Sequence, residues 1–362
     1  MRLLKPLATL ALVASTVTLH AQGKAHLIEL DSRSTTFLSG VSATGAVAVG
    51  TFDGGGAFYW TPTSGIVAAG GSSANGVSGD GRTIVGAAVD SNNLTNAAIW
   101  QRAAQWRTLG GFSGGASCDA SLSSALGVSR DGRTVVGYAY RGCTAAHAFR
   151  WDESSGMVDL GSSVAGRSST ASAVSADGRM VVGEQTMETG FTIGVRWVDG
   201  RQEAIPGPMG LPVGNAYGVS GDGTFVVGRQ CRPAIPDDRE QSAWIWSARD
   251  GTQCLQAPAL RPPPGPPVLV YANAVSDDGR VVGGSQTVGT VDGNAILWID
   301  GNPSYLKDYL QAHGVPDAFR TWINTGKITA MTPDGRILVG WGAALGGFRG
   351  YMVILDDLEP RR

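Results

Sequence analysis

Apolar residues recur along this chain in a fixed thirteen-residue phrase. In the clearest copy, residues 74–86, short apolar runs flank the polar turn Ser78-Gly79-Asp80-Gly81. Such runs joined at Asp-Gly predict a tight β-hairpin, because the turn needs positive φ, which Gly and Asp tolerate. The copies have their cores at residues 38–50, 74–86, 125–137, 171–183, 216–228, 272–283 and 329–340. The first of them has Thr44-Gly45 in place of Asp-Gly.

A second apolar phrase follows each hairpin and predicts a half-buried third strand. It reads Ala57-Phe58-Tyr59-Trp60 in the first copy, and six copies end in tryptophan: Trp60, Trp100, Trp151, Trp197, Trp246 and Trp298. Short fourth strands are expected at residues 65–67, 106–109, 157–160 and 252–255. Four strands per repeat, at a mean period of about 48 residues, predict an all-β, seven-bladed β-propeller, with six or eight blades as alternatives.

The two ends of the chain complement each other. The last repeat stops after its third strand at residues 351–355, and a matching fourth strand is found at residues 26–30. We therefore expect the N-terminal strand to complete the last blade and close the ring, which removes an exposed sheet edge. A helical insertion is expected at 305–323, where Leu306, Tyr309 and Leu310 have helical spacing before Gly314.

The first residues predict export from the cytoplasm. Two basic residues, Arg2 and Lys5, precede an apolar run at 6–19 and the small residue Ala21. This pattern is typical of a signal peptide at 1–21, cleaved after Ala21, and leaves residues 22–362 as a single β-propeller domain. The protein is therefore expected to be secreted or periplasmic.

Four cysteines fit an oxidising compartment. Cys118 and Cys143 fall in loops on the same face of a propeller, and Cys231 lies in a loop of the blade whose fourth strand holds Cys254. We expect disulfides Cys118–Cys143 and Cys231–Cys254, among three possible connectivities.

Composition narrows the classes of partner. The chain is 43% hydrophobic and 16% charged, holds 53 glycines, and has a net charge of −2. These values suit a turn-rich extracellular β-protein and give no electrostatic reason to expect nucleic acid or membrane insertion. We expect a monomer.

The repeated polar residues are interpreted as structural. We expect the repeated aspartates to stabilise their own turns, because separate blades hold them too far apart to share a metal ion. We expect the arginines after each turn to be solvated or paired with a nearby aspartate, and the tryptophans to pack between blades. No catalytic residue, metal site or cofactor is predicted, since histidine is scarce and lacks ligand spacing.

Length variation is concentrated on the face opposite the Asp-Gly turns, where binding is usually found on a rigid scaffold. The most charged of these loops supplies the candidate binding residues Arg232, Asp237, Asp238, Arg239 and Glu240. The favoured function is non-enzymatic binding of an extracellular glycan, peptide or surface partner. The alternatives are a structural envelope module and a polysaccharide hydrolase or lyase, whose carboxylates would come from Asp119, Glu184, Glu188, Asp237 and Asp238.

These phrases resemble the HAF-repeat family of bacterial extracellular proteins. The tripeptide of that name occurs as His147-Ala148-Phe149, followed by Trp151. The helical segment 306–310, then Gly314-Val315 and Trp322, also follows the order found in the family. The resemblance covers essentially the whole mature chain. It implies a secreted propeller-like protein and carries over no catalytic residues.

Overall fold

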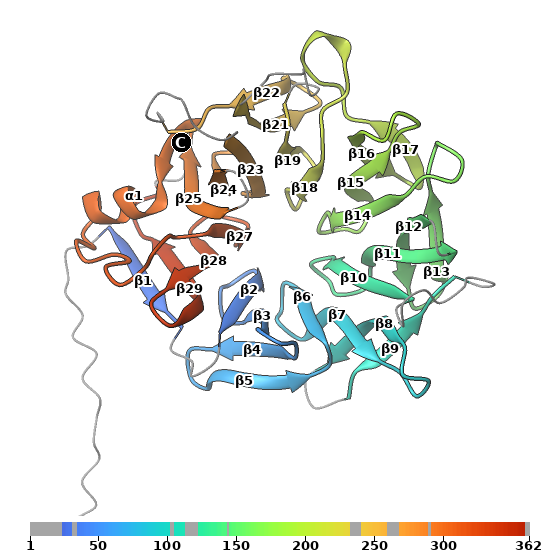
Figure 1. Ribbon diagram of the computed structural model, residues 1–362, viewed down its shortest axis with the longest axis horizontal. Helices are drawn as coiled ribbons and strands as arrows, with labels where there is room; N and C mark the ends of the chain where they lie inside the picture. Colours follow the sequence, from blue (N-terminus) through green and yellow to red (C-terminus); the bar gives the residue numbers. More distant parts are fainter. Residues whose placement is uncertain are drawn as a thin grey trace, which may run out of the picture.

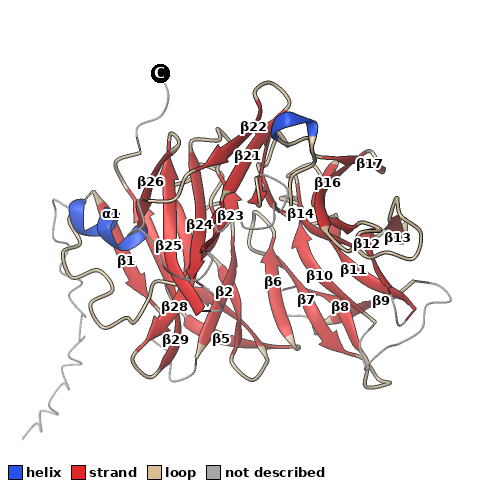
Figure 2. Cartoon of the chain, turned by 45° about the horizontal axis from the view of Figure 1, so that its top comes forward, coloured by secondary structure: helices blue, strands red, loops and turns tan. Residues whose placement is uncertain are grey.

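The sheets of this protein are arranged around a common central axis (Figure 1). The computed structural model describes residues 24–30, 35–101, 105–112, 122–142, 145–231, 240–258, 268–288 and 291–358. Within these residues, the strands form five four-stranded sheets and one nine-stranded sheet. The all-β prediction is therefore confirmed, and almost all of the chain drawn in Figure 2 as regular structure is strand.

Four sheets are simple antiparallel meanders of consecutive strands. The first two contain β2 (Thr36–Val41), β3 (Ala48–Phe52), β4 (Ala57–Thr61), β5 (Gly65–Gly70), β6 (Ser73–Val77), β7 (Thr83–Val89), β8 (Thr95–Gln101) and β9 (Arg107–Gly110). The next two contain β10 (Ser123–Val128), β11 (Val135–Gly142), β12 (Ala145–Asp152), β13 (Gly156–Gly161), β14 (Ser169–Val174), β15 (Met180–Thr186), β16 (Thr192–Val198) and β17 (Arg201–Ala204).

The nine-stranded sheet consists of two such meanders and one short strand. The first meander contains β18 (Ala216–Val219), β19 (Phe225–Arg229), β21 (Ala243–Ser247) and β22 (Gly251–Leu255). The second contains β23 (Val268–Val275), β24 (Val281–Val288), β25 (Val291–Ile299) and β26 (Asn302–Tyr305). A single bridge between Arg229 and Tyr271 joins β19 to β23, and β20 (Glu240–Gln241) pairs in parallel with β23.

The two ends of the chain meet in the remaining sheet. It contains β27 (Lys327–Met331), β28 (Ile337–Ala344), β29 (Gly347–Leu355) and the N-terminal strand β1 (Ala25–Glu29). β1 pairs antiparallel with β29, from Ala25 opposite Leu355 to Glu29 opposite Tyr351. The predicted completion of the last sheet by the N-terminal strand is confirmed, and Figure 1 shows blue β1 beside red β29.

The expected helical insertion at 305–323 is α-helical only over its first part, and this helix packs between β25 and β26 and the N-terminal strand of the last sheet. Helix α1 (Leu306–Ala312) ends before Gly314 and buries Leu306 and Leu310 in the cluster that contains Tyr351. A short 3-10 turn at Pro208–Gly210 is the other helical element of the described residues. No helix in the described ranges is long and apolar enough to span a membrane.

The innermost strands approach one another closely around the axis. We call β2, β6, β10, β14, β18, β23 and β27 the inner strands, because each begins a repeat and borders the axis (Figure 1). Each carries a bulge between the first and third residues of its repeat, as between Ala74 and Gly76. A Cβ on Gly76 would lie 3.4 Å from the carbonyl oxygen of Leu126 in the next inner strand. The third repeat position therefore holds only glycine or alanine.

The pairing register corrects two repeat boundaries. Ala272 pairs with Gly284, and Ile328 pairs with Gly340, as Ala74 pairs with Gly86. The sixth copy therefore ends at Gly284 instead of Gly283, and the seventh begins at Ile328 instead of Thr329. The doublet Gly283-Gly284 hides the true end of the sixth copy, and Ile328 replaces the usual first alanine of the seventh.

The third-strand tryptophans pack against the preceding sheet. Trp197 and Trp298 are fully buried, and their indole Nε1 groups donate to the carbonyl oxygens of Leu160 and Gln256 at 3.1 Å and 2.6 Å. Trp197 lies in one apolar cluster with Val136 of the sheet before it. This burial confirms the predicted packing role, because a buried ring cannot stack on an external sugar.

The structure contains a disulfide between Cys231 and Cys254, the second of the two predicted pairs. It ties the end of β19 to the outer strand β22, with the two Cα atoms 5.4 Å apart. The predicted pair Cys118–Cys143 lies outside the described residues.

The closing glycine of each repeat provides a test of this packing. A Cβ on Gly86 would overlap the carbonyl oxygen of Ser73, and the surrounding backbone has little room to move. We expect Gly86→Ala to lower the free energy of unfolding by about 3 kcal/mol or more. Gly142→Ala is the matched control, because a Cβ there meets no atom within 4 Å. Urea unfolding of both variants would contradict the account if their losses were equal.

Candidate functional site

The repeated aspartates stabilise their own turns. The Asp80 carboxylate accepts hydrogen bonds from the Ser78 hydroxyl at 2.6 Å and the Arg82 backbone N–H at 3.0 Å. The Ser78 bond is the main cause that lowers the Asp80 pKa below its usual range. The same pattern recurs at Asp131, Asp177, Asp222, Asp278 and Asp334. The turn interpretation is confirmed, and within the described residues no three potential metal ligands lie together.

The residue before each aspartate joins its turn to the next one around the axis. The backbone N–H of Gly79 donates to the carbonyl oxygen of Arg130 at 2.9 Å, and Arg130 donates in turn to Ala176 at 3.2 Å. Equivalent bonds run from Ala43 to Gly79, from Ala176 to Gly221 and from Asp277 to Pro333. These bonds tie neighbouring inner strands together on one face of the ring, which we call the Asp-Gly face. The opposite face is the long-loop face.

The residue before the turn aspartate, or before Thr44 in the first copy, is alanine or glycine in most copies. In two copies it is charged, and these two side chains meet across the axis. Arg130 Nη2 lies 2.7 Å from Asp277 Oδ2, although 147 residues separate them in the sequence. The other oxygen of Asp277 accepts the Gly221 N–H at 2.6 Å. A cavity of about 180 Å³ lies at this end of the axis, lined by both residues and by apolar side chains such as Val77. The ion pair therefore bridges the axis at the Asp-Gly face.

The arginines that follow the turns do not form a basic ring. Arg82 lies 3.8 Å from Asp80 on its own turn, and Arg280 lies 2.9 Å from Asp300. Arg336 donates to the carbonyl oxygen of Leu358 at 2.8 Å. Each arginine thus has a local partner, as the sequence predicts.

A polar cluster lies toward the long-loop face, where β15, β18, β19 and β23 come together. We call Glu184, Tyr217, Arg229 and Tyr271 the axial cluster. Arg229 donates to the Asn215 side-chain oxygen at 3.0 Å and to the Tyr271 hydroxyl at 3.3 Å. Its guanidinium also lies 5.4 Å from the centre of the Tyr271 ring, and the Tyr217 and Tyr271 rings are 6.2 Å apart.

Strand alternation directs Glu184 and Arg229 toward the neighbouring sheets. Val182, two residues before Glu184 on the same strand, packs with Val226 and Trp244 of the next sheet. Side chains two residues apart share a sheet face, so Glu184 faces the same neighbour. Burial raises the pKa of the Glu184 carboxyl, and the Arg229 charge only partly opposes this. Burial also raises the pKa of Tyr217, and the Glu184 charge adds to that shift.

On the other side of the ring, aromatic residues occupy the repeat positions that correspond to those of the axial cluster. Trp341 follows the closing glycine of its repeat, as Glu184 and Arg229 do. Its ring lies 4.8 Å from that of Phe37 and 5.5 Å from that of Phe348. Lys327 Nζ lies 4.5 Å from the centre of the Trp341 ring. The residues at these positions therefore differ from repeat to repeat, unlike those of the turns.

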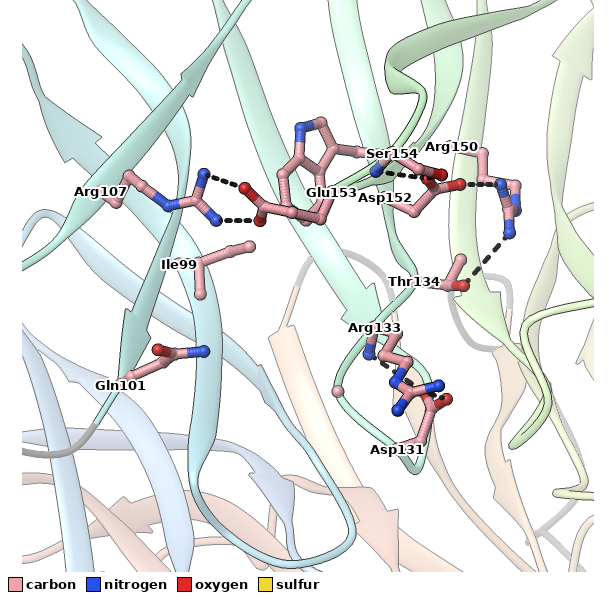
Figure 3. A pocket seen from close by; sticks show the side chains of 12 residues that line it. Ile99, Gln101, Arg107, Asp131, Arg133, Thr134, Arg150, Asp152, Glu153 and Ser154 are labelled. Carbon is pink, nitrogen blue, oxygen red and sulfur yellow. Dashed lines mark hydrogen bonds and ion pairs between the residues drawn. The ribbon is translucent and has the colours of Figure 1, made fainter.

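The larger cavities lie between neighbouring sheets. One of about 510 Å³ is lined by β8, β9 and the turns of the next sheet, with Trp151 and Ile99 at its apolar part. Figure 3 shows that its charges are paired: Arg107 with Glu153 at 2.7 Å and Arg150 with Asp152 at 2.5 Å. A cavity of about 360 Å³ in the nine-stranded sheet is built the same way around Trp298. Grooves of this kind form where neighbouring sheets meet. Most of the charged residues that line these two grooves are paired with one another.

The predicted binding residues lie at the limit of the described structure. Arg232, Asp237, Asp238 and Arg239 fall outside the described residues, and Glu240 is described only by its backbone in β20. Of the carboxylates proposed for an enzyme, Asp119, Asp237 and Asp238 also fall outside. Glu184 belongs to the axial cluster. Glu188 lies in the exposed turn after β15, where its carbonyl oxygen accepts from Arg167.

The sequence interpretation missed Arg130, Asp277, Tyr217 and Arg229. Each occupies a repeat position where other copies have mostly smaller or uncharged residues. Arg130 and Asp277 stand at the same position in two copies and have opposite charges. Departures from the repeat consensus were therefore the available signal, and they mark positions where the fold does not dictate the residue.

Comparison with known proteins identifies the fold and no family. No protein-family model matches the sequence, and no curated protein matches it. The structure of the RRP9 WD40 repeats is 14% identical, with a TM-score of 0.53, and the match covers 91% of this chain and 97% of that one. The structure titled U3-55K gives a TM-score of 0.51 at 14% identity, over 91% of this chain and 98% of that one. The fold is a β-propeller.

A weaker similarity is found to TolB from Acinetobacter baumannii. It has a TM-score of 0.45 and 12% identity, and the match covers 74% of this chain and 63% of TolB. This similarity is too low to support an inference about this protein.

Glu184 provides a test of the electrostatics at the axis. Because its carboxyl binds a proton more tightly in the folded than in the unfolded chain, its contribution to stability is greatest below pH 4.5, its usual pKa. That contribution is lost as the pH rises through the folded-state pKa. We expect Glu184→Gln to raise Tm by about 1–2 °C at pH 7.5 and to leave it unchanged at pH 4. Glu188→Gln, in the exposed turn, is the control and should change Tm at neither pH; equal effects of the two variants would contradict the burial of Glu184.

Proposed function

We propose that this protein is a secreted or periplasmic, non-enzymatic binding protein with a seven-bladed β-propeller scaffold and HAF-type repeats. Its partner is an extracellular glycan, peptide or cell-surface component, which it binds on the long-loop face. Seven copies of the repeat hairpin, six of them with Asp-Gly at the turn, and the closure of β1 on β29 support the blade count. The Cys231–Cys254 disulfide supports an oxidising compartment, together with the signal-peptide pattern at residues 1–21.

The two ends of the axis differ in how strongly the fold constrains their residues, and this difference is the main support for the proposal. At the Asp-Gly face, nearly every repeat position is needed by a turn, a bulge or a bond between inner strands. Toward the long-loop face, the residue after each closing glycine varies freely. These residues are Thr51, Ala87, Tyr138, Glu184, Arg229, Ser285 and Trp341. Positions that the fold leaves free, on a rigid scaffold, are those available for recognition.

The described polar groups favour binding over chemistry. The axial cluster combines one carboxylate, one guanidinium and two phenols, and Arg229 is already held by Asn215 and Tyr271. Such a fixed set of donors and acceptors orients a ligand.

A binding assay with face-specific variants tests this proposal. We expect the mature protein to bind envelope or extracellular polymers of its source cells. Replacing Arg232, Asp237, Asp238, Arg239 and Glu240 together by serine should weaken this binding at least tenfold, a loss of about 1.4 kcal/mol. The matched variant replaces Arg82, Arg133 and Arg179, which are strongly exposed on the Asp-Gly face, and should bind normally.

Biolayer interferometry on immobilised envelope fractions measures both variants. Loss of binding only in the Asp-Gly variant would place the partner on the wrong face for this proposal. An absence of binding by the unmodified protein would contradict the proposal as a whole.

A further inference from the structure

We propose that the axial cluster binds a neutral, hydroxyl-rich sugar unit of a saccharide. This inference rests on the proposed function and specifies the class of ligand and the residues that recognise it. Its basis is the juxtaposition of Glu184, Tyr217, Arg229 and Tyr271, which three successive repeats bring together beside the axis.

The charges of the cluster exclude a strongly charged ligand. Glu184 and Arg229 carry opposite charges, and Arg229 is close enough to oppose the pKa shift of the Glu184 carboxyl. A cationic ligand attracted by Glu184 would be repelled by Arg229. An anionic ligand attracted by Arg229 would be repelled by Glu184. A neutral ligand avoids both penalties and can still use the polar atoms of both side chains.

The hydrogen bonds of the cluster leave an acceptor available. Arg229 uses its Nε and Nη1 groups on Asn215 and Tyr271. Glu184, in contrast, accepts no hydrogen bond from the residues that the structure describes. The side chain is only partly buried and its oxygens are open to solvent, so ligand hydroxyl groups can take the place of water at this carboxylate.

The two tyrosines add flat apolar surface with polar tips. Their rings lie 6.2 Å apart at an interplanar angle of 31°, and Arg229 fixes the Tyr271 hydroxyl at 3.3 Å. Aromatic rings of this kind offer contact area to the C–H face of a sugar, while phenol groups bond to its hydroxyls. A peptide would use these groups less completely, since it offers few hydroxyl donors to Glu184.

The architecture also sets the direction of approach. The Arg130–Asp277 ion pair bridges the axis at the Asp-Gly face, and the Gly221 N–H holds the Asp277 carboxylate in place. A ligand therefore reaches the cluster from the long-loop face, at which β19 ends.

Calorimetric titration with defined saccharides tests the inference. The probes are the neutral trisaccharides maltotriose, cellotriose, xylotriose and tri-N-acetylchitotriose, with trigalacturonic acid and chitosan trimer as the anionic and cationic comparisons. We expect at least one neutral probe to bind and both charged probes to bind at least tenfold more weakly. Tyr217→Ala and Glu184→Gln should each weaken the neutral interaction at least tenfold.

The control variant is Phe191→Ala, which removes an exposed aromatic ring in the turn between β15 and β16. It should bind the neutral probe normally, and thermal unfolding confirms that each variant is folded. Stronger binding of a charged probe, or neutral binding that survives Tyr217→Ala, overturns this inference. If the unmodified protein captures an envelope peptide and no saccharide, this inference fails while the proposed function stands. If it binds neither saccharide nor envelope component, both fail.

Discussion

The close approach of the inner strands at the central axis is the constraint on which the rest of this structure depends. Where these strands meet, a Cβ on Gly76 would lie 3.3 Å from the Val85 side chain and 3.4 Å from the Leu126 carbonyl oxygen. The third repeat position is therefore glycine or alanine, and the bulge beside it recurs in each repeat. The closing glycine follows from the same geometry, because the bulged strand fills the space where its side chain would be.

Polar interactions then fix the relative position of neighbouring sheets. The Ser-x-Asp-Gly turn satisfies its own polar groups, which leaves the backbone of the x residue free to bond to the next turn. Tryptophans on the third strands bury apolar area between the same sheets farther from the axis. The hairpin motif thus combines two tasks, forming one turn and joining it to another.

Much of this architecture follows from the sequence, because it repeats. The Asp-Gly turns, the short helix after Tyr305 and the pairing of residues 25–29 with the last strand all depend on local patterns or on a missing fourth strand. The axial cluster and the Arg130–Asp277 pair do not. Arg130 and Asp277 lie 147 residues apart and meet only because the sheets close into a ring, while the axial cluster combines residues from three successive repeats. A repeat phrase shows which positions are constrained, and it cannot show which unconstrained residues become neighbours.

Backbone bonds between successive turns hold the ring together at the axis. Native-state hydrogen exchange of the Gly79 and Arg130 amides tests this claim most directly, because both donate to the next turn. These two amides are expected to exchange only through global unfolding, together with those of the buried second strands. Exchange at the rate of an unprotected turn amide, while the second strands remain protected, would contradict it.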